Sequence, residues 1–221
     1  MRTAGEKLEG GSRRQWIGWV VLRGRLPLWL KLSYTAFVAV LVTYIRDQHG
    51  PQNFLWACDI ALFVTVAALW REDALLASSM AVAVLLPEVA WNVDFFTRLI
   101  VGRDVFGLDA TGYMFDSATP LFVRALSLFH VFLPILLLYM VHRLGYHRRA
   151  FLTASILAWI VLPVSYFFTD QSRNINWVFG ITDVPQTWLP GPIYLGAMMA
   201  LVPIILYLPV HFALRSIFGL R

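Results

Sequence analysis

ALLASSMAVAVLLPEVAWNV, residues 74–93, is the stretch that decides the fold. Its length matches the roughly 20 apolar residues that a helix needs to cross the hydrocarbon core of a membrane. Glu88 is its one charged side chain. A charge within a span costs on the order of 3 kcal/mol unless it is paired or faces water, so such residues are candidates for function. The stretch therefore predicts both a membrane span and a site within it.

The rest of the chain has the composition of an integral membrane protein. Of its 221 residues, 59% are hydrophobic and 14% are charged, whereas soluble domains are about 45–50% apolar and about 25% charged. We predict an all-α, polytopic membrane helix bundle with about six transmembrane helices. The predicted spans lie near residues 28–45, 53–70, 74–93, 119–142, 147–168 and 188–214.

Residues 28–214 form the predicted six-helix domain, between a basic N-terminal segment, 1–27, and a short tail, 215–221. The apolar run from Trp16 to Leu22 is too short to span, so we expect it to lie in the membrane interface. The longest stretch between spans, 94–118, contains glycines and aromatic residues. It predicts an ordered outer loop or re-entrant segment that caps the bundle.

The basic residues indicate which side of the membrane each loop occupies, because cytoplasmic loops carry an excess of Lys and Arg. With a cytoplasmic N-terminus, the inner side holds Arg2, Lys7, Arg13, Arg14, Arg23, Arg25, Lys31, Arg71, Arg143, Arg148, Arg149, Arg215 and Arg221. The outer side holds only Arg46, Arg98, Arg103 and Arg173. We therefore expect both termini in the cytoplasm and a multi-pass protein of the bacterial cytoplasmic (inner) membrane. This topology also explains the formal charge of +5, so nucleic acid is not an expected partner.

Helix rise places the deep polar side chains in the outer half of the membrane. Cys58 and Asp59 lie just below the outer start of the second span, and Glu88 and Asn92, at i and i+4, share one face of the third. We expect these groups to form one polar pocket. Its predicted lining is Asn53, Asp59, Glu88, Asn92, Arg124, Ser127, Asn174 and Asn176. Cys58 and His130 are expected in the same pocket.

Each of these residues also has a structural interpretation. Cys58 can serve as a small buried hydrophobic residue. Asp59 or Glu88 can form an ion pair with Arg124. His130 can join two helices by hydrogen bonds. The pattern alone leaves these alternatives open.

Several enzyme classes are excluded by what the sequence lacks. Di-iron desaturases need clustered histidines, but His130 is the only one of the five histidines deep in a predicted span. The chain has no HExxH zinc motif, no Walker or GxGxxG phosphate loop and no GxSxG nucleophile turn. Its single cysteine, Cys58, excludes a disulfide and a multi-cysteine zinc site. We therefore expect neither a metal nor a cofactor.

Three strings carry a resemblance to known proteins: NFLWACDIA at 53–61, LSLFHVFLP at 126–134 and NINW at 174–177. They resemble a family of bacterial membrane-associated proteins of unassigned function. More distantly, a Cys in the second segment, a His in the fourth and an Asn-x-Asn-aromatic loop before the last span are similar to the YwaF-type integral membrane family. That family is related to eukaryotic intramembrane acyltransferases and fatty-acid ester hydrolases.

The resemblance implies Cys58 as nucleophile and His130 as base of an intramembrane lipid acyltransferase or acyl hydrolase. A thiol needs a neighbouring imidazole to become a thiolate, and Asn92, Asn53 or Arg124 is expected to stabilise an oxyanion or a lipid phosphate. The alternative is a non-catalytic lipid- or quinone-binding subunit of a membrane complex. Membrane lipid is the expected partner in both cases, together with other membrane proteins or further copies of the chain. Only the enzyme requires Cys58 close to His130.

Overall fold

The computed structural model describes residues 25–105, 107, 109–182 and 184–219, and this part of the chain is helical, without strands. Its α-helices are α1 Leu28–His49, α2 Ala57–Arg71, α3 Ala74–Val101, α4 Leu121–Ser127, α5 Phe129–Leu144, α6 Ala150–Phe168, α7 Gly191–Leu201 and α8 Leu208–Phe218. Short helical turns are η1 Pro51–Leu55, η2 Gly112–Met114, η3 Gln171–Arg173, η4 Ile175–Trp177 and the π-helical η5 Val202–Tyr207. The run from Trp16 to Leu22, predicted to lie in the interface, falls outside the described residues.

Five segments of the described chain are long and apolar enough to cross a membrane. They are Leu28–Asp47, Ala74–Val101, Leu121–Leu144, Ala150–Phe168 and Gly191–Phe218. The prediction of an all-helical, multi-pass membrane protein is thereby confirmed. The remaining predicted span, 53–70, corresponds to η1 and α2, and α2 has only 15 residues, fewer than the roughly 20 that a straight crossing needs.

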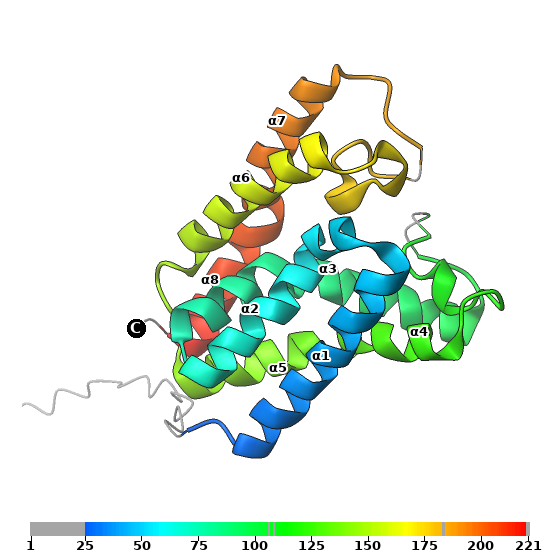
Figure 1. The fold of residues 1–221 in the computed structure, drawn as a ribbon. Helices are drawn as coiled ribbons and strands as arrows, with labels where there is room; N and C mark the ends of the chain where they lie inside the picture. Colours follow the sequence, from blue (N-terminus) through cyan, green and yellow to red (C-terminus); the bar gives the residue numbers. More distant parts are fainter. Residues whose placement is uncertain (1–24, 106, 108, 183, 220–221) are drawn as a thin grey trace, which may run out of the picture.

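Helix α3 is the centre of the bundle, since it packs against α2, α5, α6, η5 and α8 (Figure 1). Every residue from Ala77 to Leu85 is buried. This stretch is rich in Ala and Ser, and small residues let neighbouring helix backbones approach closely. The middle of the segment that predicts the membrane fold therefore lies in the core of the bundle.

Two groups of connections gather at opposite ends of the bundle (Figure 1). We call one the basic end: it comprises the start of α1, the α2–α3 turn, the α5–α6 link and the end of α8. Glu72, in the α2–α3 turn, accepts hydrogen bonds from Lys31 Nζ at 2.7 Å and from the Leu26 amide at 3.0 Å. The His147 amide donates to Ser78 Oγ at 3.0 Å. The other end, which we call the loop end, carries the α1–α2, α3–α4 and α6–α7 connections.

Helix α3 is longer than its predicted span of 74–93. It continues to Val101 and ends at Gly102, whose φ of +81° suits glycine. Asp94 does not end the helix, because its buried carboxylate accepts hydrogen bonds from the Val105 amide at 2.9 Å and from Thr111 Oγ1 at 2.6 Å. The predicted ordered loop therefore begins at residue 102 and is tied back onto α3.

The predicted fourth and sixth spans are each divided into two helices. Leu128 forms a tight turn between α4 and α5, at the sixth residue before Pro134. The last span changes to a π-helix at η5. Pro203 has no amide hydrogen for the carbonyl of Met199, and this carbonyl instead accepts a hydrogen bond from Trp159 Nε1 at 2.8 Å. Prolines within these spans thus leave carbonyls that side chains of other helices satisfy.

Candidate functional site

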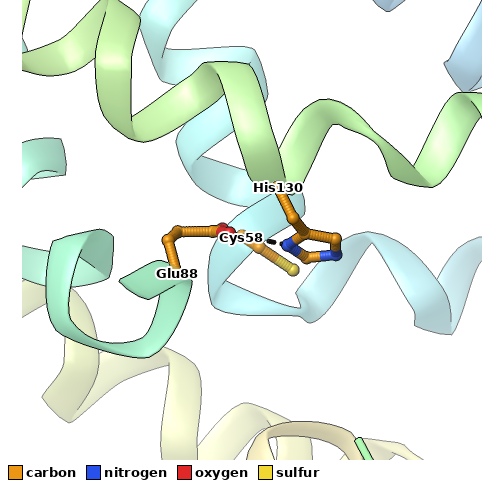
Figure 2. A group of neighbouring side chains, drawn as sticks. All are labelled: Cys58, Glu88 and His130. Atoms are coloured by element: carbon orange, nitrogen blue, oxygen red, sulfur yellow. Dashed lines mark hydrogen bonds and ion pairs between the residues drawn. The ribbon is translucent and has the colours of Figure 1, made fainter. Parts of the chain in front are cut away.

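Cys58, Glu88 and His130 converge from three different helices, α2, α3 and α5 (Figure 2). The Cys58 sulfur, a Glu88 carboxylate oxygen and a His130 ring nitrogen all lie within 4.8 Å of one another. The residues are 30 and 42 positions apart in the chain, so only helix packing brings them together. The predicted proximity of Cys58 to His130 is therefore present, and Glu88 is the third member.

The closest contact of the cluster joins Glu88 to His130. Oε2 of Glu88 lies 2.7 Å from Nδ1 of His130, and the Glu88 side chain is 2% exposed. A buried carboxylate needs a hydrogen-bonded or charged partner, and here the partner is the imidazole. The ion pair of Glu88 with Arg124, which was one sequence-based alternative, is not formed.

The His130 ring is held in place by aromatic neighbours. Trp91 stacks on it with 4.6 Å between ring centroids, and the Phe129 ring lies at 3.9 Å. With Nδ1 directed at Glu88, the other ring nitrogen, Nε2, has no hydrogen-bond partner among the described residues. The ring is thus oriented by three contacts and keeps one nitrogen available for proton transfer.

Asn92 belongs to the frame of the site. Its Nδ2 donates to the carbonyl of Glu88 at 2.8 Å and to the carbonyl of His130 at 2.6 Å. The carbonyl of His130 is the one that Pro134 leaves without an amide donor. Both Asn92 amide hydrogens are therefore used to join α3 to α5, and the expected role as an oxyanion donor does not fit this geometry.

Asp59 is 3% exposed and lies in the first turn of α2, where the helix dipole favours a carboxylate. Its Oδ2 accepts a hydrogen bond from Asn53 Nδ2 at 3.2 Å. Asp59 therefore has η1 as its partner and is not paired with Arg124.

Arg124 holds the loop that precedes α4. Its Nε donates to the carbonyl of Thr119 at 2.9 Å and its Nη1 to the carbonyl of Met114 at 3.4 Å. Both acceptors are backbone atoms of the 102–120 connection. Arg124 thus stabilises the predicted cap of the bundle. Because its guanidinium is bonded to this loop, Arg124 is not the partner of Asp59 or Glu88.

The two asparagines of the NINW string have backbone positions that most side chains avoid, with φ of +43° at Asn174 and +56° at Asn176. Asn174 organises its own loop, since its Nδ2 donates to the carbonyls of Gly180 and Thr182. Asn176 reaches α2 instead. Its Oδ1 accepts the Ala57 amide at 2.9 Å, and its Nδ2 donates to the Leu55 carbonyl at 2.7 Å. It fixes the first turn of the helix that carries Cys58.

The sequence did not single out Tyr113, which lies in η2. Burial raises the pKa of the Tyr113 hydroxyl to about 12, while side-chain hydrogen bonds with Ser127 and Trp91 act in the opposite direction. Cys58 and Glu88 also interact electrostatically with this hydroxyl. The predicted capping loop thus delivers a phenol to the cluster and to Ser127. A tyrosine in the predicted outer loop was the available signal.

The predicted single pocket is largely filled by its own lining. Asn53 with Asp59, Glu88 with His130, and Asn92 with backbone carbonyls are bonded to one another. A cavity of about 30 Å³ lies beside the site and is lined by Ala57, Asn176 and residues of α3, α6 and η5. The polar residues therefore form a packed cluster that includes Cys58, Glu88 and His130.

No protein-family model, curated protein or solved structure matches the chain. The resemblance to the YwaF-type family stays a prediction.

Proposed function

We propose that this protein is a multi-pass enzyme of the bacterial cytoplasmic membrane, with Cys58 as nucleophile and His130 as base in acyl transfer from, or hydrolysis of, a membrane lipid. The observation that carries the proposal is the convergence of Cys58, Glu88 and His130 within 4.8 Å. A nucleophile, a base and a group that orients the base are the three parts that nucleophilic catalysis requires.

The roles follow from the contacts. Glu88 holds Nδ1 of His130 at 2.7 Å, as the carboxylate does in a catalytic triad, and it stabilises the imidazolium when the ring takes up a proton. We assign the Cys58 proton to Nε2, the ring nitrogen that is not bonded to Glu88. The thiolate attacks the ester carbonyl, and the leaving alkoxide takes the proton from His130. A thioester remains on Cys58. An acceptor hydroxyl or water then loses its proton to His130 and attacks the thioester carbonyl, and the departing Cys58 thiolate takes this proton back from His130.

Tyr113 replaces Asn92 as the proposed oxyanion donor. Both amide hydrogens of Asn92 are bonded to backbone carbonyls, and Arg124 is bonded to the loop. The Tyr113 hydroxyl interacts with both Cys58 and Glu88, and its pKa of about 12 keeps it protonated at neutral pH. A protonated phenol that exchanges its bond with Ser127 for the substrate can donate a hydrogen bond to the charge that develops on the carbonyl oxygen.

A six-crossing topology with both termini cytoplasmic fits this role. The α1–α2, α3–α4 and α6–α7 connections share the loop end (Figure 1), which requires η1 and α2 to return the chain to the basic end. Excess Lys and Arg favour the cytoplasmic side for the basic end. Cys58 is the second residue of α2, so the cluster lies toward the loop end, in the outer half of the membrane. Lipid is the substrate class because a site at this depth is bordered by acyl chains.

The test is the reactivity of Cys58 toward an acyl-chain iodoacetamide in native membranes. We expect His130→Gln and Glu88→Gln to slow labelling by about tenfold or more, because the thiolate is lost. His142→Gln, a histidine of α5 at the basic end, is the matched control and should label like the wild type. Thiol counting after denaturation normalises each sample.

Equal labelling rates in wild type and both variants would contradict the proposal. Cys58 would then be a packing residue. The second function, a non-catalytic lipid- or quinone-binding subunit, would be favoured by a lipid or quinone that co-purifies with the protein in mild detergent.

A further inference from the structure

We propose that Cys58, Glu88 and His130 bind one Zn²⁺ ion and that the bound ion blocks the thiol. The proposed zinc binding does not depend on catalysis, whereas inhibition of the enzyme by zinc rests on the proposed function. The described part of the chain holds no other group of three or more His, Cys, Asp or Glu side chains with ligand atoms this close.

The donor set selects the metal. A thiolate sulfur, an imidazole nitrogen and a carboxylate oxygen are the three ligand types of protein zinc sites, whereas Mg²⁺ and Ca²⁺ take oxygen ligands. Three protein ligands leave a fourth position of the tetrahedron open. The composition therefore favours Zn²⁺ in a site that still accepts water or another small ligand.

The present spacing is close to that of a zinc site. Ligands at about 2.0–2.3 Å from a tetrahedral ion lie roughly 3.3–3.7 Å from one another. The separations within the cluster range from 2.7 Å, between Glu88 and His130, to at most 4.8 Å. Binding thus requires the Glu88–His130 contact to open by about 0.6 Å, and a separation at the 4.8 Å limit to close by about 1 Å. Side-chain rotation supplies shifts of this size without moving the helices.

Charge balance favours a divalent ion at this position. The cluster supplies one thiolate and one carboxylate, so Zn²⁺ makes the group neutral, and a neutral set is far less costly to bury than separate charges. The ion replaces the thiol proton of Cys58 and the proton that Glu88 and His130 share. These protons leave to solvent.

The surroundings hold the ligands in orientation. Trp91 stacks on the His130 ring, and Asn92 fixes the backbone carbonyls of both Glu88 and His130. Outer contacts of this kind orient metal ligands and raise affinity. Asn176 does the same for Cys58 by fixing the amide of the preceding residue, Ala57.

The experiment uses the full-length protein in mild detergent, stripped with a chelator and then given ZnCl₂ or MgCl₂. Metal content after desalting is measured by mass spectrometry, and access to Cys58 by maleimide labelling. We expect about one Zn²⁺ per chain, no retained Mg²⁺, and labelling slowed by Zn²⁺ alone. Glu88→Gln and His130→Gln should weaken zinc binding by about tenfold or more, whereas His142→Gln should bind like the wild type.

Wild-type protein alone can overturn the proposal, so failure of a variant to fold does not rescue it. The proposal is wrong if Zn²⁺ is lost on desalting and leaves the labelling rate of wild-type Cys58 unchanged. It is also wrong if Glu88→Gln and His130→Gln retain as much Zn²⁺ as the wild type. The labelling rates in chelator test the nucleophile separately. Zinc protection of Cys58, together with a chelator labelling rate that does not depend on His130, supports the metal site and rejects the catalytic role. A chelator labelling rate that depends on His130, without zinc protection, rejects the metal site and supports the catalytic role.

Discussion

Asn92 donates a side-chain hydrogen bond of 2.6 Å to the carbonyl oxygen of His130. That oxygen would bond to the amide of residue 134 in a regular helix, but residue 134 is proline. The catalytic candidate is thus held by a side chain that substitutes for a missing backbone donor. Asn92 therefore couples the position of His130 to α3, the helix that also carries Glu88.

Asn92→Ala should destabilise the protein by about 1–3 kcal/mol, because it leaves a partly buried carbonyl without a donor. Pro134→Ala restores the amide, so the same substitution should cost less in a Pro134→Ala background. Unfolding free energies in mixed micelles measure the cycle, and a coupling of at least about 0.5 kcal/mol is expected. Strictly additive effects would show that the His130 carbonyl does not depend on Asn92.

Asn176 contributes both a cap and a strained backbone. Asn176→Gly removes the hydrogen bonds to Ala57 and Leu55 but relieves the φ of +56°. Asn176→Ala loses the same bonds and keeps the strain, so it should be less stable than the glycine variant by about 1 kcal/mol. Both should change the rate of Cys58 labelling, since both release the first turn of α2. Thermal unfolding and labelling in parallel test this, and equal stability of the two variants would exclude the strain.

Asp94→Ala should free the loop that delivers Tyr113. The buried carboxylate accepts from the Val105 amide and Thr111 Oγ1, and its loss removes both ties. Arg103 is exposed in this loop, so we expect faster trypsin cleavage there. Asp116→Ala, in the same connection but exposed, is the control. Cleavage at equal rates in both variants would contradict the role of Asp94.

Glu72 predicts an acid sensitivity of the basic end. The hydrogen bond from Lys31 holds the pKa of Glu72 below its ordinary value, against a smaller effect of burial. A lowered folded-state pKa contributes stability above the ordinary carboxyl pKa, and this contribution is lost as the pH falls through the lowered value. The group is partly exposed, so the effect is about 0.2–1 kcal/mol. Glu72→Gln should flatten the pH dependence of unfolding over this acidic range, and an unchanged profile would count against it.

The positions of the spans follow from sequence because the membrane imposes a length and an apolar composition on them. The predicted stretches 74–93 and 147–168 lie within or over α3 and α6. The divisions at Leu128 and in η5 were not predicted, since they depend on how proline-freed carbonyls find donors on other helices. The Asn92–His130 hydrogen bond is of this kind and was not predicted. The place of Tyr113 near the cluster was not predicted either.

The approach of Cys58, Glu88 and His130 to one another could be expected from their depth, but the pairing of Glu88 with His130 could not. Glu88 and His130 each lie deep in a predicted span and require a polar partner. Several candidate partners are predicted at the same depth in the membrane. Which two meet depends on the rotation of each helix about its axis, which a single sequence does not define. An ion pair of Arg124 with Asp59 or Glu88 was therefore one of the open alternatives, whereas the long side chain of Arg124 reaches the carbonyls of Met114 and Thr119.

The bond from Ala57 to Asn176 spans 119 positions of the chain. At a synthesis rate of about 5–20 residues per second, Asn176 is made roughly 6–24 seconds after the residue that it caps. During this interval the growing chain carries Cys58 on a helix whose first turn is not yet secured. A thiol reagent present during translation and one added afterwards therefore meet the same cysteine in two different surroundings.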